Sequence, residues 1–308
     1  MHATRVASLV SGALLMQAAA LAGAAQEDRP VTLRFAGAVN GSAFECGRQY
    51  SGVGSGGSTI EPGDFRFFVS AVELIGRDGK AVPVALDQDG VWQYRDVALV
   101  DLENGAGACG NGTAAVHAEV SGRVPRGEYT GVRFTLGVPF ESNHGDPTLA
   151  PSPLNLTAMF WNWQGGYKFL KVDLNSAVQS AHAMAGAHGA DAGARHAGGH
   201  DAASAPGFAL HLGSTQCAAR SQTESPSACR NPNRVTVTFE GFDPDRNTIV
   251  ADIGAVLAGT DVERNAPDTS PGCMSFPKDA DCTAVMNALG LPYDGIAPAG
   301  AQKFFSMK

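Results

Sequence analysis

The chain has 308 residues, a formal net charge of -8 and 44% hydrophobic residues, which is enough to bury a full core as one large domain or two smaller ones. Acidic residues outnumber basic ones by 30 to 22 and no basic cluster occurs, which excludes a typical nucleic-acid-binding protein. Beyond the N-terminal segment, no stretch approaches the roughly 20 consecutive apolar residues of a transmembrane helix, so no membrane insertion of the mature chain is expected.

The first 24 residues have the pattern of a secretory signal peptide. Arg5 is followed by the apolar stretch 6–21, and Ala22, Gly23 and Ala24 supply the small residues of a cleavage site. We therefore expect residues 1–24 to be removed on export and residues 25–308 to form a single domain.

Strand patterns dominate the remaining chain. Alternating apolar residues and β-rich runs predict strands at 31–35, 64–75, 82–86, 129–138, 167–174, 208–212 and 235–242. Residues 77–79 form a hairpin-turn sequence after the second of these. Two short helices are predicted, at 253–257 and 283–289. Many short strands separated by turns indicate a mostly β fold, an antiparallel β-sandwich or barrel.

Six cysteines in an exported chain indicate disulfides and an oxidising compartment. Sequence alone leaves the pairing open, but the short separations favour Cys217–Cys229 and Cys273–Cys282, with Cys46–Cys109 as the long closure. Thiolate metal ligation is the rival interpretation, although no Cys-x-x-Cys sequence is present.

One segment, residues 176–205, departs from the strand pattern. It is rich in Ala, Gly and His and lacks aromatic residues, which predicts a mobile surface loop. Its side chains could collect soft or borderline metals weakly, but a tolerated low-complexity insertion is equally consistent. The residues concerned are His182, Met184, His188, His196 and His200.

Three other histidines are candidate ligands. His144 lies in the loop 139–147 directly after a predicted strand, where binding residues are common, although a lone loop histidine is more typical of a solvated surface. His211 points away from the apolar residues of its strand, and the small neighbour Gly213 leaves room for a ligand. Taken alone, His211 is typical of a half-buried histidine bonded to backbone, and His117 is a reserve candidate.

No catalytic set is present in the sequence. There is no Gly-x-Ser-x-Gly, His-Glu-x-x-His or phosphate-binding glycine loop, and each cysteine has an expected partner. The carboxylates beside strand patterns are typical of turn caps or partners of Arg66 and Arg133; they are Asp64, Asp101, Glu103 and Asp173. We therefore do not expect an enzyme.

Two of the three tryptophans, Trp161 and Trp163, are one residue apart. Indole is only a hydrogen-bond donor and cannot bind a metal, but oxidative opening of its ring exposes an amine and a ketone. The pair is therefore either packing or a site of oxidation. Met159 would share the side of a strand with Trp161, although filling of the core is its favoured role.

Together these motifs resemble the MbnP family of exported copper-binding proteins, associated with methanobactin operons and also described as four-cysteine partners of the metallo-mystery pair. The resemblance runs from about 31 to 305, and its carriers are the segments 64–67, 97–103, 134–140, 143–144, 151–155, 159–169, 210–217 and 271–274.

The resemblance implies a mostly β copper protein of the periplasm. In the family, a dihaem partner of the cytochrome c peroxidase or MauG type (MbnH type) oxidises the first Trp of Trp-x-Trp to kynurenine, and the modified protein binds one copper ion as Cu(I). By position, Trp161 is the modified residue and Trp163 a possible electron relay. The family's four cysteines correspond to Cys46, Cys109, Cys217 and Cys229.

The ligand set is our own inference from that resemblance. Imidazoles suit Cu(I), so we expect His144 and His211 to join the aniline nitrogen of a kynurenine at Trp161, with His117 as an alternative. Two other functions remain open: a secreted copper-dependent oxidase or hydrolase, and a structural or adhesive β module in which the tryptophans pack or dock a partner.

Overall fold

The computed structural model describes residues 27–308 except 163, 177–206 and 222–223. The predicted signal peptide, Trp163 and the histidines of the 176–205 segment lie outside the described residues. Ser176 itself is described, and it is the buried last residue of a strand instead of the start of a loop. Within the described ranges, no helix is long and apolar enough to cross a membrane.

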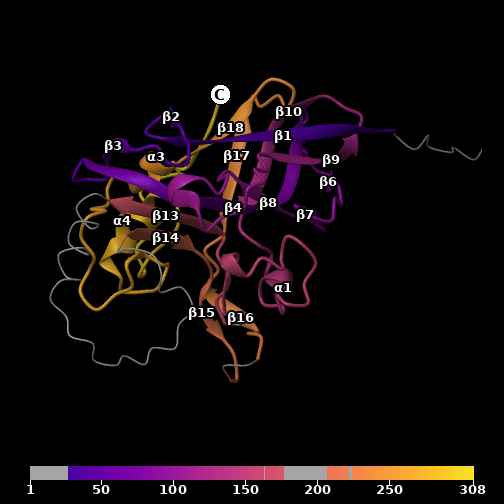
Figure 1. Cartoon of the computed structure of the whole chain (residues 1–308). Helices are drawn as coiled ribbons and strands as arrows, with labels where there is room; N and C mark the ends of the chain where they lie inside the picture. The colour runs from indigo at the N-terminus through magenta and orange to yellow at the C-terminus, as the bar shows by residue number, and fades with distance from the viewer. Residues whose placement is uncertain (1–26, 163, 177–206, 222–223) are drawn as a thin grey trace, which may run out of the picture.

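Two large sheets form the body of the protein (Figure 1). The first sheet has the order β20-β18-β1-β9-β6, with β2 beside β1. Its strands are β1 (Asp28–Val39), β2 (Ser42–Ala43), β6 (Ala85–Leu86), β9 (Glu119–Pro125), β18 (Thr248–Asp252) and β20 (Phe305–Met307).

The second sheet has the order β17-β10-β4-β13-β14-β19. Strands β3, β5 and β8 also pair with the long β4, and β7 pairs with β8. Its strands are β3 (Tyr50–Val53), β4 (Ser58–Gly76), β5 (Ala81–Pro83), β7 (Gln93–Tyr94), β8 (Val97–Asp101), β10 (Tyr129–Leu136), β13 (Leu170–Ser176), β14 (Phe208–Leu212), β17 (Val235–Glu240) and β19 (Gly272–Cys273).

Two small two-stranded sheets and short helices complete the described fold. The small sheets are β11 (Phe160–Asn162) with β12 (Gly166–Tyr167), and the hairpin β15 (Thr215–Ala218) with β16 (Ala228–Asn231). The helices are η1 (Gly107–Cys109), α1 (Phe140–Asn143), η2 (Thr157–Met159), α3 (Ile253–Leu257) and α4 (Ala280–Ala288). Figure 1 shows the β15–β16 hairpin projecting from the body near α1.

Aromatic rings fill the space between the two sheets. Phe35 of the first sheet meets Phe67 and Phe134 of the second with ring centroids 5.7 and 5.8 Å apart, and Phe134 meets Phe305 at 5.2 Å. These edge-to-face pairs add about 0.5–1.5 kcal/mol each beyond their area burial. Because side chains alternate along a strand, Phe67 points into this core and Arg66 points to the outer face of the second sheet.

The predicted mostly β sandwich is confirmed, with two parallel strand pairs, β1–β18 and β14–β19, in an otherwise antiparallel arrangement. The strand at 208–212 and the helix at 253–257 coincide with β14 and α3. The second helix begins at Ala280 instead of 283, because the Asp279 carboxylate accepts a hydrogen bond from the backbone N–H of Asp281 at 3.0 Å and caps that end.

Two predicted strands are wrong as single elements. The one at 82–86 is divided, since β5 pairs with β4 in the second sheet while β6 pairs with β9 in the first. The one at 167–174 is interrupted because the N–H of Lys168 donates to the Met159 carbonyl and that of Phe169 to the Leu212 carbonyl, so the chain leaves β12 before β13 begins.

All three predicted disulfides are present: Cys46–Cys109, Cys217–Cys229 and Cys273–Cys282. The middle one joins residues directly opposite each other on β15 and β16. The first attaches the η1 turn to the segment before β3, and the third attaches α4 to β19.

Candidate metal centre

A row of charged side chains crosses the outer face of the second sheet. Arg66 of β4 lies opposite Asp101 of β8 on one side and Lys171 of β13 on the other, and Lys171 in turn lies opposite His211 of β14. Directly paired residues of neighbouring strands share a face. The register therefore brings one imidazole and three charged groups from four strands into one line.

Ion pairs and hydrogen bonds join this row to the residues two positions away. Asp64 accepts a hydrogen bond from Nε of Arg66 at 2.8 Å and one from Nζ of Lys171 at 2.6 Å. Nζ of Lys171 is also 3.1 Å from Asp173, whose second oxygen lies 2.7 Å from Nε2 of His211. The row ends on an imidazole, and each of these charges has an opposite partner, as buried charges require.

Burial dominates the protonation of His211. It lowers the pKa of the imidazole below its ordinary value, and the hydrogen bond to Asp173 opposes that shift only in part. Burial alone would raise the pKa of Asp173, but the hydrogen bond from His211 and the Lys171 ammonium hold it below its usual range. A neutral imidazole beside an ionised carboxylate must donate its Nε2–H, which leaves the lone pair on Nδ1.

Nδ1 of His211 is buried and has no hydrogen-bond partner among the described residues. A buried acceptor without a partner is costly in a folded protein. A metal ion bound at Nδ1 would satisfy it, and a carboxylate on the opposite nitrogen is the usual orienting group of metal-ligating histidines. The Nδ1 atom of His211 therefore has the surroundings expected of a metal ligand.

The indole of Trp161 packs against Gly213, two residues after His211. A Cβ atom on Gly213 would lie 2.5 Å from Cζ3 of Trp161 and 2.8 Å from the carbonyl oxygen of Tyr167, so glycine makes this approach possible. Gly213 comes directly after β14, so this contact places the indole beside the end of the strand that carries His211. The indole also stacks on Phe276, with centroids 5.8 Å apart.

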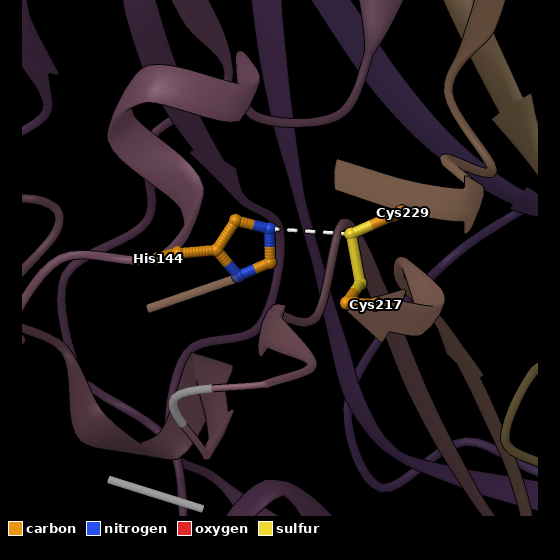
Figure 2. A group of neighbouring side chains, drawn as sticks. All are labelled: His144, Cys217 and Cys229. Atoms are coloured by element: carbon orange, nitrogen blue, oxygen red, sulfur yellow. Dashed lines mark hydrogen bonds between the residues drawn. A yellow bond between two sulfur atoms is a disulfide. The ribbon is translucent and has the colours of Figure 1, made fainter. Parts of the chain in front are cut away.

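His144 lies directly after α1 and is buried. Its Nε2 is 3.1 Å from Nδ2 of Asn143 and 3.4 Å from Sγ of Cys229, and its carbonyl accepts a hydrogen bond from Ser225 at 2.7 Å. Figure 2 shows the imidazole facing the Cys217–Cys229 disulfide. Of the loop predicted at 139–147, residues 140–143 form a single helical turn, and His144 directly after it contacts the hairpin.

Asn143 connects His144 to the two segments that carry the other predicted ligands. Its Oδ1 accepts a hydrogen bond from the Tyr167 N–H at 2.8 Å, and its Nδ2 lies 3.4 Å from the Gly165 carbonyl and 3.5 Å from Oγ of Ser214. Ser214 follows the glycine on which the Trp161 indole rests. These contacts place the segments that carry residues 144, 161 and 211 next to one another near the end of β14.

His117 and Met159, the other candidates from sequence, are placed elsewhere. His117 stacks on Trp92 with centroids 4.8 Å apart and pairs with Asp101 at the far end of the charged row. Four interstrand steps separate it from His211, roughly 19 Å, so both cannot bind one ion. Met159 is fully buried in the hydrophobic core and ends η2 instead of lying on the strand of Trp161.

Two clusters of potential ligands involve disulfide sulfurs. They are His144 with Cys217 and Cys229, and Glu103 with Cys46 and Cys109. The ligating form of cysteine is the thiolate, so neither cluster offers sulfur ligands while its disulfide is closed. Sequence reasoning missed Asp173 as the partner of His211 and Phe276 as the partner of Trp161. The sequence did contain a signal for Asp173: Lys171 and Asp173 are two residues apart on a predicted strand and therefore share a face.

Comparisons with known proteins identify a family for this chain. A family model described as MbnP matches residues 28–275. A solved structure, MbnP from Methylosinus trichosporium, is similar with a TM-score of 0.74 and 28% sequence identity, over 91% of this chain and 98% of that chain. No curated protein matches.

Proposed function

Since the chain belongs to the MbnP family, a copper-associated family, we propose that it is a periplasmic copper-binding protein in copper homeostasis. It holds one Cu(I) after Trp161 has been oxidised to kynurenine by a dihaem partner of the cytochrome c peroxidase or MauG type. It is a carrier of the metal and a substrate of that partner, and not itself an enzyme.

The observation that carries this proposal is the buried Nδ1 of His211, which has no hydrogen-bond partner among the described residues, on the strand whose end the Trp161 indole contacts. Imidazole nitrogens suit copper, and His211 would bind through Nδ1 while Asp173 holds its Nε2–H. His144 would supply a second imidazole. The ring-opened residue 161 would supply the aniline nitrogen that intact indole lacks.

Trp161 is suited to oxidation by a partner protein. Its side chain is partly exposed, and Phe276, which stacks on it, is 48% exposed. With peroxide as oxidant, cleavage of the C2–C3 bond adds two oxygen atoms to the indole while two molecules of peroxide are reduced to water. Hydrolysis then releases formate and leaves the free aniline. The product has one oxygen atom more and one carbon atom fewer than tryptophan.

The test is to produce the protein together with its dihaem partner and measure intact mass and bound copper. Wild type should carry the kynurenine mass change and copper, and Trp161→Phe should lose both while its circular dichroism spectrum is unchanged. Trp92→Phe is the matched control, since Trp92 stacks on the remote His117. Copper retention by Trp161→Phe equal to that of wild type would show the proposed mechanism to be wrong.

The stacked pair of partly exposed Trp161 and exposed Phe276 also favours the docking alternative, in which the two rings bind a partner without any metal. The same preparation distinguishes the two functions. If the chain is a docking module, its complex with the partner protein should contain no copper, and residue 161 should be unmodified tryptophan.

A further inference from the structure

The Cys217–Cys229 disulfide lies directly against a buried imidazole. The two sulfurs and a nitrogen of His144 all lie within 4.8 Å of one another, and Sγ of Cys229 is 3.4 Å from Nε2 of His144. Figure 2 shows the ring directed at the sulfurs. Once the S–S bond is broken, two thiolates and one imidazole are within reach of a single ion.

We propose that reduction of Cys217–Cys229 opens a second metal site, in which Cu(I) is bound by the Cys217 and Cys229 thiolates and the His144 imidazole. The disulfide takes two electrons and two protons from a dithiol, which is itself oxidised to a disulfide. The two new thiols then release their protons when Cu(I) binds, because the thiolate is the ligand.

Accessibility favours reduction at this disulfide. Cys217 and Cys229 are both partly exposed on the small hairpin. In the other two disulfides at least one cysteine is 0–1% exposed, namely Cys109, Cys273 and Cys282. Thiol–disulfide exchange requires attack by a thiolate on an accessible sulfur, so a dithiol should open the hairpin disulfide first.

The number and type of ligands favour Cu(I) over Zn²⁺. Structural zinc sites take four ligands, whereas this cluster provides three among the described residues. Thiolates are soft ligands that select Cu(I) or zinc, and imidazole suits both. The hydrogen bond from Ser225 to its carbonyl fixes the backbone of His144, and Cu(I) bound at Nε2 would replace the contact of that nitrogen with Nδ2 of Asn143.

This second site does not require oxidation of Trp161, but it uses the His144 that we also assign to the copper site of the proposed function. The two sites would therefore compete for one imidazole. Opening the hairpin would move copper from the nitrogen ligands beside Trp161 to the sulfurs of β15 and β16.

The experiment uses the Trp161→Phe protein, which cannot form the kynurenine site. It is briefly reduced with dithiothreitol, desalted without oxygen and titrated with Cu(I) against bicinchoninate. We expect one more Cu(I) per chain than in the disulfide form, with sulfur scattering in the copper X-ray absorption spectrum. His144→Gln should weaken this binding by roughly 10-fold or more, since even outer-shell changes cost that much, while the matched control His117→Gln should not.

Two controls test whether the sulfurs that bind Cu(I) are those of Cys217 and Cys229. Alkylation of the reduced protein with iodoacetamide, followed by peptide mass spectrometry, should label Cys217 and Cys229 before the other cysteines and abolish the uptake. The Cys217→Ser/Cys229→Ser variant should also fail to bind. If the reduced protein binds no more Cu(I) than the alkylated sample, or prefers Zn²⁺, the inference is wrong, whatever the outcome for Trp161 in the disulfide form.

Discussion

The contact between Gly213 and the Trp161 indole allows a quantitative test of how the candidate site is built. In Gly213→Ala, the new methyl carbon would lie 2.5 Å from Cζ3 of Trp161 and 2.8 Å from the carbonyl oxygen of Tyr167. The carbonyl belongs to the backbone and cannot move cheaply, so the indole must give way. Overpacking of this kind costs about 1–3 kcal/mol of folding stability. Loss of the stacking between Trp161 and Phe276 would account for about 0.5–1.5 kcal/mol of that cost.

Urea unfolding of four proteins measures this cost as a double-mutant cycle: wild type, Gly213→Ala, Trp161→Ala and the double variant. Gly213→Ala should lower the free energy of unfolding by about 1–3 kcal/mol in wild type. In the Trp161→Ala background the cost should fall by about 1 kcal/mol or more, because the indole clash is gone and only the Tyr167 carbonyl remains.

Gly145→Ala is the matched control, since nothing lies within 4 Å of a Cβ atom there and its φ is not positive. It should be neutral or slightly stabilising. Equal costs of Gly213→Ala with and without the indole would refute the packing of Trp161 against β14. In protein made with the haem partner, Gly213→Ala should also reduce the fraction of residue 161 that is converted to kynurenine.

Three further outcomes are expected. Asp173→Asn should weaken copper binding about 10–100-fold in chelator competition, because the carboxylate that orients His211 is lost; an unchanged affinity would exclude Nδ1 as a ligand. Asp101 has its pKa raised to about 7 by burial and by Glu103, so the folded protein binds more protons than the unfolded chain between pH ~4 and ~7. The free energy of unfolding should therefore fall as pH rises through that window, by up to about 1.4 kcal/mol per pH unit. Asp101→Asn should flatten this part of the plot of urea midpoint against pH. An equal slope in both proteins would contradict the raised pKa of Asp101. His117→Gln should leave copper content unchanged by metal analysis, and a loss of copper would contradict the position of the site.

Local patterns in the sequence predicted the parts of the fold that depend on neighbouring residues. The alternation of 208–212 gave the correct facing of His211, and the short separations of the C-terminal cysteines gave their pairing. The hairpin β15–β16 was missed because its strands are four residues each and have no apolar alternation. Strand β18 was missed as well, and its parallel partner β1 is more than 200 residues away in sequence.

The partners within the candidate site depend on register between distant strands. Asp173 reaches His211 only because β13 and β14 pair with Lys171 opposite His211, across a segment of about thirty residues in sequence. Taken alone, His211 was typical of a histidine bonded to backbone, whereas its Nε2 bonds the Asp173 carboxylate. The sequence left the partners of Arg66 and Arg133 open among four carboxylates; Arg66 pairs with one of them, Asp64, whereas Arg133 pairs with Glu73, which is outside that set.

The most direct measurement is anomalous diffraction at the copper absorption edge, from crystals of protein produced with its dihaem partner. We predict one strong copper peak within bonding distance of Nδ1 of His211, next to a ring-opened side chain at position 161. A copper peak beside an intact indole, or one located at His117, would contradict the proposed centre.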